Sequence, residues 1–311
     1  MVKKKKLIII YKSIGLIIFS LLNIYIIILQ IDEYKRKSNE VKKENCFLKP
    51  EFEDKKIIHI IITSFLMELT KPDEFVKKMY TKEFILNGIR VMKKYLFPSL
   101  QYQSCRDFIW MLIVGDKANI TYIKSLLNFY RPFKSVIISS KKFKNYIRNL
   151  TKNADVLITT RIDYDDRIYW KAVNDVRKVV NISKPMFVYG YNRGFFYFEE
   201  YDFYSPFFSN YNNNGTMSIF QSLILVLNKV NDSYTIYDVG PHTMVRKIVL
   251  ENYKRYGIEK LDYEPAFIDN NAPKFVYVRQ KFSWSLKYFN KDKIKIKIKY
   301  FNLDKFYGIK K

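Results

Sequence analysis

The 311-residue sequence has few of the residues on which many enzyme classes depend. It contains two histidines and two cysteines, so no Cys/His cluster with the spacing of a zinc site exists. Its nine glycines form neither a G-x-G-x-x-G segment nor a Walker-type loop. These absences argue against a zinc enzyme, a dinucleotide-binding oxidoreductase and a P-loop enzyme.

Acidic residues are also few. The chain has 30 Asp and Glu residues against 55 Lys and Arg residues, which gives a formal charge of +25. Such a charge suits a nucleic acid or an anionic surface as partner. Lys, Ile, Asn and Tyr are all abundant together, however, which an AT-rich genome produces without selection for binding. Both interpretations stay open. Hydrophobic residues make up 48% of the chain and aromatic residues 17%, which is typical of a folded protein.

One long apolar segment stands near the start of the chain. Residues 7–29 are long enough to cross a bilayer as a helix, and Lys3 to Lys6 precede them, as expected of a cytoplasmic tail at residues 1–6. No small-residue cleavage site follows, which favours a signal anchor over a removed signal peptide. We expect a stem at residues 30–55, a catalytic domain at residues 56–290 and a basic C-terminal segment at residues 291–311. The domain would then be lumenal, in the Golgi or endoplasmic reticulum, or extracytoplasmic.

Most acids are scattered, but three crowd into four positions after an apolar run. Val156 to Ile158 suit a buried strand of a mostly parallel sheet, and Asp163, Asp165 and Asp166 follow it. Ligands of open α/β sheets bind at this carboxyl edge. Carboxylates this close repel one another unless a cation such as Mg²⁺ or Mn²⁺ lies between them. The alternative is an acidic turn, with Asp166 capping the helix that follows.

The first half of the domain alternates between two hydrophobic periodicities. Buried strands are predicted at residues 57–63, 108–114 and 135–139, with His59 as a core histidine. Helices are predicted at residues 83–96, ended by Pro98, at residues 120–130 and around Asn145. This alternation is typical of a parallel sheet with helices on its faces.

The second half is less regular, and we expect it to face an acceptor. Strands are predicted at residues 185–190 and 195–198, a loop at residues 210–215 and a helix at residues 243–256. Glu199, Glu200 and Asp202 follow the second strand and are candidates for a general base that deprotonates an acceptor hydroxyl. A solvated acidic turn is the alternative for each of them.

Three motifs resemble a known family when they are taken together. Pro98-Ser99 with Gln103, then Phe108-x-Trp110 leading to Asp116, then Thr160-Arg161-Ile162-Asp163-x-Asp165-Asp166 are similar to the P-S-x-x-x-Q, F-x-W and T-R-L-D-x-D-D segments of a rhamnosyltransferase family of GT-A-type glycosyltransferases. The similarity spans roughly residues 57 to 285. Ile162 and Tyr164 depart from the usual Leu and Asn, and Gly115 precedes Asp116. These departures leave the acids in place and the identity of the sugar open.

The resemblance implies a GT-A-like fold and roles for several residues. Asp163 and Asp165 correspond to acids that bind the ribose and the divalent ion of a nucleotide-sugar diphosphate, and Asp166 would ligate or orient. A late histidine often completes the metal shell in such enzymes, and His242 is the candidate, with a local cap as alternative. The expected nucleotide-sugar-binding residues are Asp116, Arg161, Asp163, Arg279 and Lys281. The alternative interpretation of Asp116 is an acid that only stabilises a turn or caps a helix. The alternative for Arg279 and Lys281 is an ordinary basic strand edge.

Two further patterns bear on location. Cys46 and Cys105 would be able to pair in an oxidising compartment, which two cysteines alone do not establish. Sequons at Asn119, Asn149, Asn181, Asn214 and Asn231 are consistent with lumenal exposure and a glycoprotein, although an Asn-rich chain produces some by chance. The basic segment from Lys293 to Lys299 is either a surface that contacts anionic headgroups or an edge strand protected by lysines.

We therefore predict a single-pass, metal-dependent glycosyltransferase that uses Mn²⁺ or Mg²⁺. It would move a sugar from a nucleotide-diphosphate donor to a glycan or lipid-linked acceptor, with no nucleic acid as partner. One alternative is a catalytically inactive, membrane-tethered module that binds a glycan or an anionic polymer. A lesser alternative is a metal-dependent nuclease, which fits the charge but not the membrane segment.

Overall fold

The computed structural model describes most of the predicted domain. The described residues are 46–47, 49–68, 72–127, 133–208, 220–230, 234–238, 249, 253–258, 263, 266–269 and 273–279. No helix within these ranges is long and apolar enough to cross a membrane. The predicted span at residues 7–29, the loop at residues 210–215, and His242, Lys281 and the segment from Lys293 to Lys299 lie outside them.

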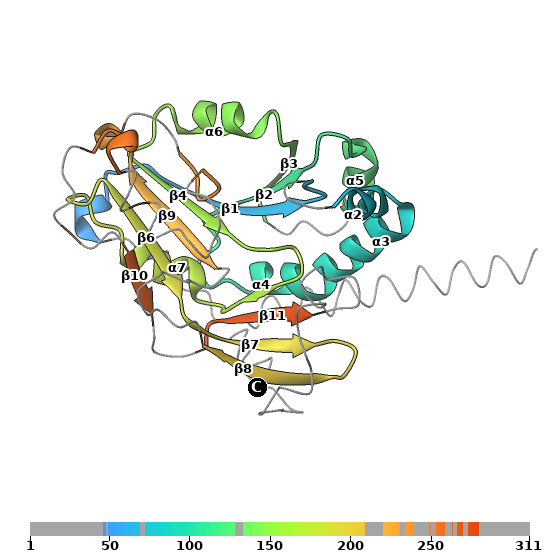
Figure 1. Ribbon diagram of the computed structural model, residues 1–311. Coiled ribbons are helices and arrows are strands. Elements are labelled where there is room, and N and C mark those ends of the chain that lie inside the picture. Colours follow the sequence, from blue (N-terminus) through green and yellow to red (C-terminus); the bar gives the residue numbers. More distant parts are fainter. Residues whose placement is uncertain are drawn as a thin grey trace, which may run out of the picture.

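A seven-stranded sheet forms the centre of the fold, in the order β10-β6-β9-β4-β1-β2-β3 (Figure 1). Its strands are β1 (Ile57–Phe65), β2 (Ile109–Val114), β3 (Ser135–Ser139), β4 (Val156–Arg161), β6 (Met186–Tyr191), β9 (Gln221–Val226) and β10 (Ala266–Asp269). The predicted strands of the first half are confirmed. β1 pairs in parallel with both β2 and β4, whereas β9 runs antiparallel between β4 and β6. The sheet is therefore mostly parallel, as predicted, with one reversed strand.

Helices cover both faces of this sheet. They are α2 (Asp73–Met79), α3 (Lys82–Val91), η2 (Met92–Leu96, a π-helix), α4 (Phe97–Gln101), α5 (Ile120–Leu127), α6 (Phe143–Thr151) and α7 (Ala172–Lys178). On one face, α3, α4 and α7 pack on side chains such as Ile61 and Trp110; on the other, α6 packs on Ile60 and Ile62. Because successive residues of β1 point to opposite faces, an almost continuous apolar run serves both cores.

The helix predicted to end before Pro98 continues past it. η2 joins α3 to α4 without a break, and the amide of Phe97 bonds to the carbonyl of Met92, five residues earlier. Pro98 lies at the start of α4, where its missing N–H is tolerated. The prediction of a stop was wrong because the π-turn takes up the irregularity that proline introduces.

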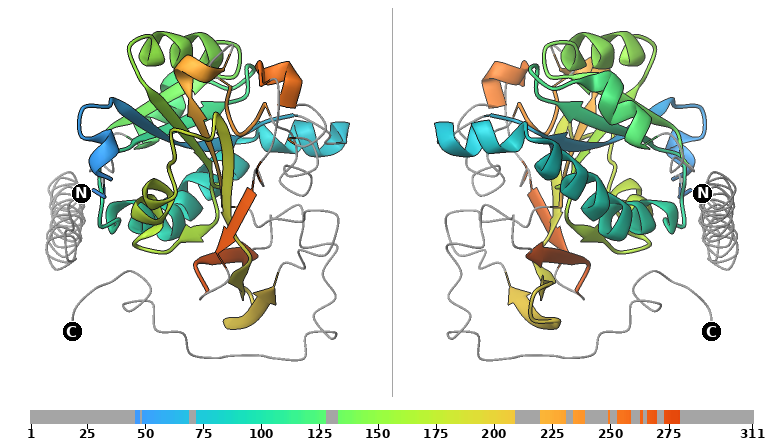
Figure 2. Two further views of the ribbon diagram at one scale, coloured as in Figure 1. Left: turned by 90° about the vertical axis from the view of Figure 1, so that its left-hand side faces the viewer. Right: turned by 90° about the vertical axis from the view of Figure 1, so that its right-hand side faces the viewer.

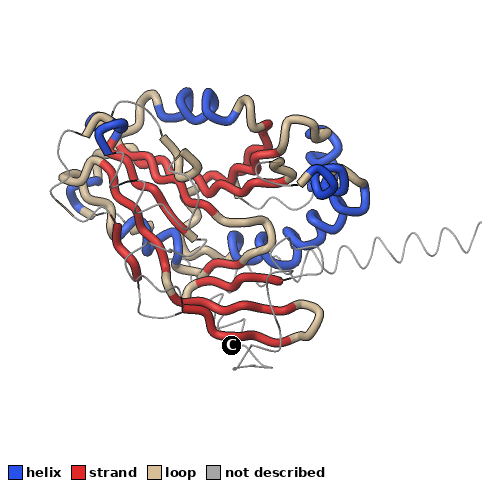
Figure 3. Tube along the Cα trace, in the orientation of Figure 1, coloured by secondary structure: helices blue, strands red, loops and turns tan. Residues whose placement is uncertain are grey.

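A second sheet of four strands was not predicted as a unit. It has the order β5-β11-β7-β8, with β5 (Arg167–Ile168), β7 (Arg193–Phe198), β8 (Phe203–Phe208) and β11 (Phe275–Arg279). The chain passes from β6 to β7 through Asn192 and so leaves one sheet for the other. Figures 2 and 3 show the second sheet beside the large sheet, on the side away from α6.

Short 3-10 turns complete the described chain. They are η1 (Pro50–Phe52), η3 (Leu227–Lys229) and η4 (Tyr253–Tyr256). η4 lies at the end of the helix predicted for residues 243–256, most of which falls outside the described residues.

The first described residues belong to the domain rather than standing apart from it. Cys46 and Cys105 form a disulfide, which answers the question that the sequence left open. The amide of Phe47 donates to Asn174 Oδ1 at 3.0 Å, and Phe52 of η1 is 1% exposed within the core. The part of the predicted stem from Cys46 onward is therefore packed against the domain.

Candidate functional site

The acidic segment lies where the sequence places it, at the C-terminal end of β4. The amide of Ile162 donates to the carbonyl of Ile62 at 3.0 Å and prolongs the pairing with β1 beyond the last residue of β4. A turn follows, closed by a 3.2 Å hydrogen bond from the Asp166 amide to the Asp163 carbonyl. The turn gives its three carboxylates three different surroundings.

Asp163 is held beside a cation at the edge of the sheet. Both Nε and Nη2 of Arg161 lie 3.4 Å from Asp163 Oδ1, and the Asp163 side chain is 31% exposed. The Arg161 guanidinium lies 5.1 Å from the ring centroid of Tyr237, which belongs to a segment far along the chain. Burial raises the pKa of Tyr237, and the Arg161 guanidinium opposes that rise. Arg161 thus lies between a partly exposed carboxylate and a partly buried aromatic ring.

Asp165 and Asp166 are both more buried than Asp163, with exposed fractions of 8% and 2%. Asp166 Oδ1 accepts a 3.1 Å hydrogen bond from the amide of Val278 in β11. The alternative in which Asp166 caps the next helix is wrong, because Lys171 occupies the N-cap position of α7. Asp166 instead fastens the acidic turn to the second sheet.

Tyr164, between the first two acids, turns into the core. Its ring meets that of Phe65 edge to face, with centroids 5.3 Å apart. Burial raises the pKa of Tyr164 well above its ordinary value, and Asp165 and Asp163 add to the rise. Its packing against the end of β1 fixes the turn that carries the carboxylates.

The donor set for a metal ion is small within the described part of the chain. No group of three or more His, Cys, Asp or Glu side chains there is arranged to hold an ion. His242 and Lys281 fall outside this part, and Arg279 is described only as a backbone position at the end of β11. Asp163 and Asp165 remain the predicted ligands among the acids of the turn, and Asp166 Oδ1 accepts a hydrogen bond from β11.

Asp116 lies at the end of β2, on the same carboxyl edge of the sheet. Its Oδ1 accepts a 3.1 Å hydrogen bond from the Lys141 amide, beyond the end of β3. A hydrogen bond from the Ser140 side chain lowers the pKa of Asp116, and the Lys141 amide adds to this effect. Asp116 therefore links the ends of β2 and β3, which agrees with the alternative interpretation of Asp116 as a turn acid. Its side chain is 31% exposed.

Gly115, next to Asp116, permits a close approach of two strand ends. A Cβ atom there would lie 2.1 Å from the carbonyl oxygen of Leu66, just after β1. Leu66 itself has a positive φ of 58°, which is uncommon for a residue with a branched side chain. The departure from the family pattern at Gly115 thus has a steric cause in this chain.

A cavity of about 450 Å³ opens beside Asp116, and no sequence motif indicates it. Its lining residues are Tyr80, Lys82, Ile85, Lys117, Ala118, Asn119 and Tyr122. The Tyr80 hydroxyl donates to Glu68 Oε1 at 2.7 Å, and Lys117 Nζ donates to Glu68 Oε2 at 3.1 Å. Glu68 fixes an aromatic and a cationic wall of the cavity in this way. The lining residues of the cavity come from the end of α2, from α3, from the β2–α5 loop and from α5, so no local pattern predicts it.

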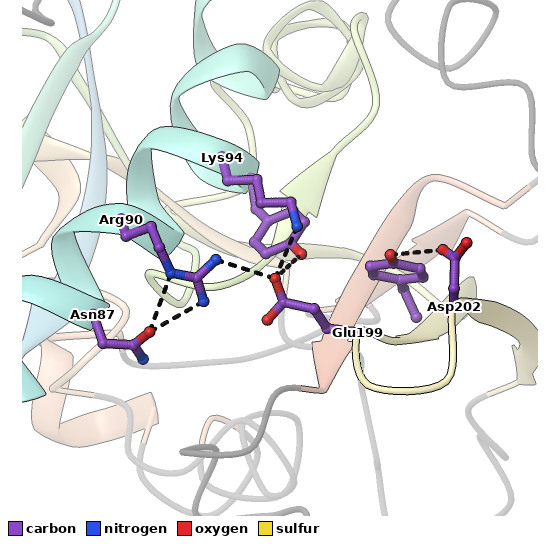
Figure 4. Close-up of polar contacts among 7 residues, drawn as sticks. Asn87, Arg90, Lys94, Glu199 and Asp202 are labelled. Atoms are coloured by element: carbon purple, nitrogen blue, oxygen red, sulfur yellow. Dashed lines mark hydrogen bonds and ion pairs between the residues drawn. The ribbon is translucent and has the colours of Figure 1, made fainter.

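Glu199, a candidate general base, is bound by three donors (Figure 4). Its Oε1 accepts from Tyr95 Oη at 2.6 Å, Lys94 Nζ at 2.9 Å and Arg90 Nη1 at 3.3 Å. Burial alone would raise the pKa of Glu199, but these hydrogen bonds outweigh burial and lower the pKa to about 2. A carboxylate with so low a pKa is a weak base, and its contacts fasten the β7–β8 turn to α3 and η2.

Glu200 and Asp202 occupy the same turn between β7 and β8. Glu200 is exposed. Asp202 has a positive φ of 47°, and its Oδ1 accepts a 2.9 Å hydrogen bond from the Tyr197 hydroxyl. Asp202 thus stabilises the β7–β8 turn, in agreement with the alternative interpretation of Asp202 as an acid of a turn.

Two motif residues that carry the family resemblance are buried and structural. Gln103 Nε2 donates to the carbonyls of Ser99 and Tyr169, each at 2.8 Å. Trp110 is fully buried, and its Nε1 donates to Thr63 Oγ1 at 3.0 Å. The Gln103 contacts join the end of α4 to the segment that precedes α7, and the Trp110 contact joins β2 to β1. The motifs therefore support the sheet that carries the acidic turn.

His59 is a core residue, as predicted. It is 2% exposed, and its Nε2 lies 2.8 Å from Thr160 Oγ1, which in turn lies 2.6 Å from Ser222 Oγ. Burial lowers the pKa of His59 well below its ordinary value, and the charge of Arg177 adds to the effect. A neutral His59 thus takes part in a chain of polar contacts that runs across β1, β4 and β9.

Comparisons with known proteins give no family. No protein-family model matches the chain. No curated protein sequence matches it either.

Several solved structures resemble the fold distantly. The inositol-1-phosphate CTP transferase of T. maritima is 9% identical, with a TM-score of 0.37, over 76% of this chain and 93% of that chain. A cytidylyltransferase from Leptospira borgpetersenii is 9% identical, with a TM-score of 0.35, over 70% of this chain and 76% of that one. S. aureus TarS 1-349 in complex with UDP is 10% identical, with a TM-score of 0.32, over 72% of this chain and 61% of that one. The first two bear the names of cytidine-nucleotide transferases and the third was solved with UDP, but with TM-scores below 0.5 neither the fold nor the site rests on them.

Proposed function

We propose that the protein is a metal-dependent glycosyltransferase that moves a sugar from a nucleotide-diphosphate donor to a glycan or lipid-linked acceptor. The observation that carries the proposal is the acidic turn at the C-terminal end of β4. There Asp163 is partly exposed beside Arg161, at the edge of a mostly parallel sheet. Ligands of open α/β sheets bind at this edge.

A divalent ion fits the chemistry of this donor set. Mg²⁺ and Mn²⁺ are commonly held by one or two carboxylates together with substrate phosphates rather than by a complete protein cage. Asp163 and Asp165 are the residues that would hold the ion, and His242 is the further candidate from the sequence. When bound, the ion would neutralise charge on the donor diphosphate.

The neighbouring residues have roles that follow from their positions. Arg161 orients Asp163 and adds a positive charge at the edge where a diphosphate would lie. Asp116 and the cavity lined by Tyr80, Lys117 and Tyr122 lie at the end of β2 and are proposed to receive the nucleoside. Arg279 and Lys281 remain candidates for binding the diphosphate.

The contacts of the three candidate residues reduce the choice of a general base to one. Glu199 is engaged by three donors, and its low pKa is unsuited to accepting a proton at neutral pH. Asp202 accepts the Tyr197 hydroxyl. Of the three candidates, Glu200 is the one we propose for the role.

We further propose that the domain lies outside the cytosol, anchored by residues 7–29. Disulfides persist in secreted proteins and in lumenal or periplasmic spaces. The Cys46–Cys105 disulfide therefore supports such a location. Only a short stretch of chain separates Cys46 from the predicted anchor.

A thermal-shift panel on the full-length protein in detergent tests this proposal. UDP, GDP, CDP and dTDP are each added with and without Mn²⁺. Binding to the native state raises apparent stability by about 3 kcal/mol when the ligand is at 100 times its Kd. We expect one nucleotide to stabilise the protein only with metal, and Asp163→Ala and Asp165→Ala to abolish the effect. The exposed Asp54→Ala variant is the matched control and should respond like the wild type.

The opposite result is also informative. A folded protein that responds to no nucleotide, with or without metal, would overturn the transferase proposal. It would favour the inactive, membrane-tethered binding module, for which metal-dependent nucleotide binding is not required.

A further inference from the structure

The surface around the disulfide carries two aromatic side chains, each with a lysine over its ring. Phe47 is 39% exposed, and Lys178 Nζ lies 5.9 Å from its ring centroid. Lys171 Nζ lies 4.6 Å from the ring centroid of Trp170. Aromatic rings beside lysines are characteristic of protein surfaces at membrane interfaces, where rings sit among the headgroups and cations meet anionic lipids.

Three hydrogen bonds connect the chain at both aromatic residues to the disulfide segment. The amide of Ser104, next to Cys105, donates to the Trp170 carbonyl at 2.8 Å. The amide of Phe47 donates to Asn174 Oδ1 at 3.0 Å, and Asn174 Nδ2 donates to Ser104 Oγ at 3.1 Å. Phe47, Trp170, Lys171 and Lys178 together are called the disulfide surface below.

Two lysines supply positive charge beside the aromatic rings of this surface. Lys178 is exposed, and Lys171 is partly exposed. Asp107 follows Cys105 by two residues, and its Oδ2 accepts from Arg177 Nη2 at 2.7 Å. The side chains of Lys171 and Lys178 add positive charge to this surface, which suits an anionic partner.

The position of the predicted anchor indicates which partner this is. Residues 30–45 connect the apolar segment to Cys46 and can span at most about 55 Å when fully extended. Since Cys46 is bonded to Cys105, the connection meets the domain at the disulfide surface.

We propose that the disulfide surface lies against the headgroups of a bilayer that contains anionic lipids. Phe47 and Trp170 would enter the interface, and Lys171 and Lys178 would face lipid phosphates. The inference rests on the proposed anchor, a part of the proposed function, and is independent of the transfer chemistry.

Tryptophan fluorescence tests the contact in the full-length protein reconstituted in nanodiscs. The bilayers contain phosphatidylcholine and phosphatidylglycerol with acyl chains brominated close to the headgroups, which quench tryptophans at the interface. In a Trp284→Phe background, which leaves Trp110 and Trp170 as the tryptophans of the chain, we expect partial quenching that Trp170→Phe removes. The matched control is Trp110→Phe, because Trp110 is fully buried and its loss should leave the quenching in place. Equal quenching with and without Trp170→Phe in this background would overturn the proposal.

The role of charge is tested in the same samples. Lys178→Glu should reduce the quenching at least twofold in bilayers with phosphatidylglycerol. The control Lys124→Glu changes an exposed lysine on α5, at another end of the molecule (Figure 1), and should have no effect. Unchanged quenching in Lys178→Glu would overturn the anionic surface as partner. Metal-dependent nucleotide binding, measured on the same nanodiscs, reports separately on the proposed transferase.

Discussion

Replacement of Glu199 by glutamine separates a structural role from a catalytic one. The Glu199 carboxylate, 17% exposed, joins the β7–β8 turn to Arg90, Lys94 and Tyr95. The fall of its pKa from 4.5 to about 2 is equivalent to about 3 kcal/mol of differential interaction. Arg90 and Lys94 are about half exposed, so solvent screens their contribution. We expect Glu199→Gln to lower the free energy of unfolding by about 1 to 2 kcal/mol at pH 7.

The pH dependence gives the sign of the effect. The pKa of Glu199 is lower in the folded than in the unfolded protein, so its stabilisation is present above pH 4.5 and is lost as the pH falls toward 2. Urea denaturation of wild type and Glu199→Gln between pH 7 and pH 3.5 should show the difference shrinking below pH 4.5. The matched control is Glu200→Gln, which changes an exposed acid one residue away.

One combination of results would refute this reasoning. If Glu199→Gln were as stable as Glu200→Gln at pH 7 and had nevertheless lost sugar transfer, Glu199 would be the base and not a structural link. The reasoning instead predicts that folded Glu199→Gln keeps most of its activity.

Three further substitutions test other parts of the structure, each by urea denaturation. Loss of the disulfide in Cys46→Ser with Cys105→Ser should cost about 4 kcal/mol, as loop entropy predicts for a separation of 59 residues, and a reductant should destabilise only the wild type. Asp166→Ala leaves the buried Val278 amide without its acceptor and should cost about 1 to 3 kcal/mol, whereas an unchanged stability would contradict the assigned contact. Gly115→Ala places a Cβ atom against a backbone carbonyl and should cost about 2 kcal/mol or more, and a neutral effect would show that the strand ends can separate.

The strands of the large sheet were predictable because their signal is local. β1, β2 and β4 are continuous apolar or β-branched runs, which is what burial on both faces requires. The reversed β9 was not predictable, since strand direction depends on a connection whose path the sequence pattern does not give.

The second sheet shows the limit of local reasoning. β5 has two residues and pairs with β11 more than a hundred residues later, so nothing near it in the sequence marks it as a strand. Asp166 was open to interpretation as a helix cap for the same reason, because its partner Val278 lies far along the chain. The sequence predicts a stop at Pro98 because the π-turn before it has no sequence signature.

The candidate site was partly predictable. The position of the acidic turn follows from the apolar run of β4 and the turn residues after it. The contact of Arg161 with Tyr237 and the cavity beside Asp116 were missed, because each joins elements distant in sequence. Glu199 was assigned by its position after a strand, which could not reveal donors on α3 and η2.

The release of a nucleoside diphosphate from a nucleotide sugar is the most direct test of the account. The full-length protein is incubated with a panel of UDP-, GDP-, CDP- and dTDP-sugars and a mixture of glycan and lipid-linked acceptors, so that an acceptor hydroxyl or water takes the sugar. Mn²⁺ or a chelator is added, and the products are measured by mass spectrometry. The account predicts metal-dependent release from at least one donor and none with Asp165→Ala. A folded protein that releases nothing from any donor in the presence of metal would contradict it.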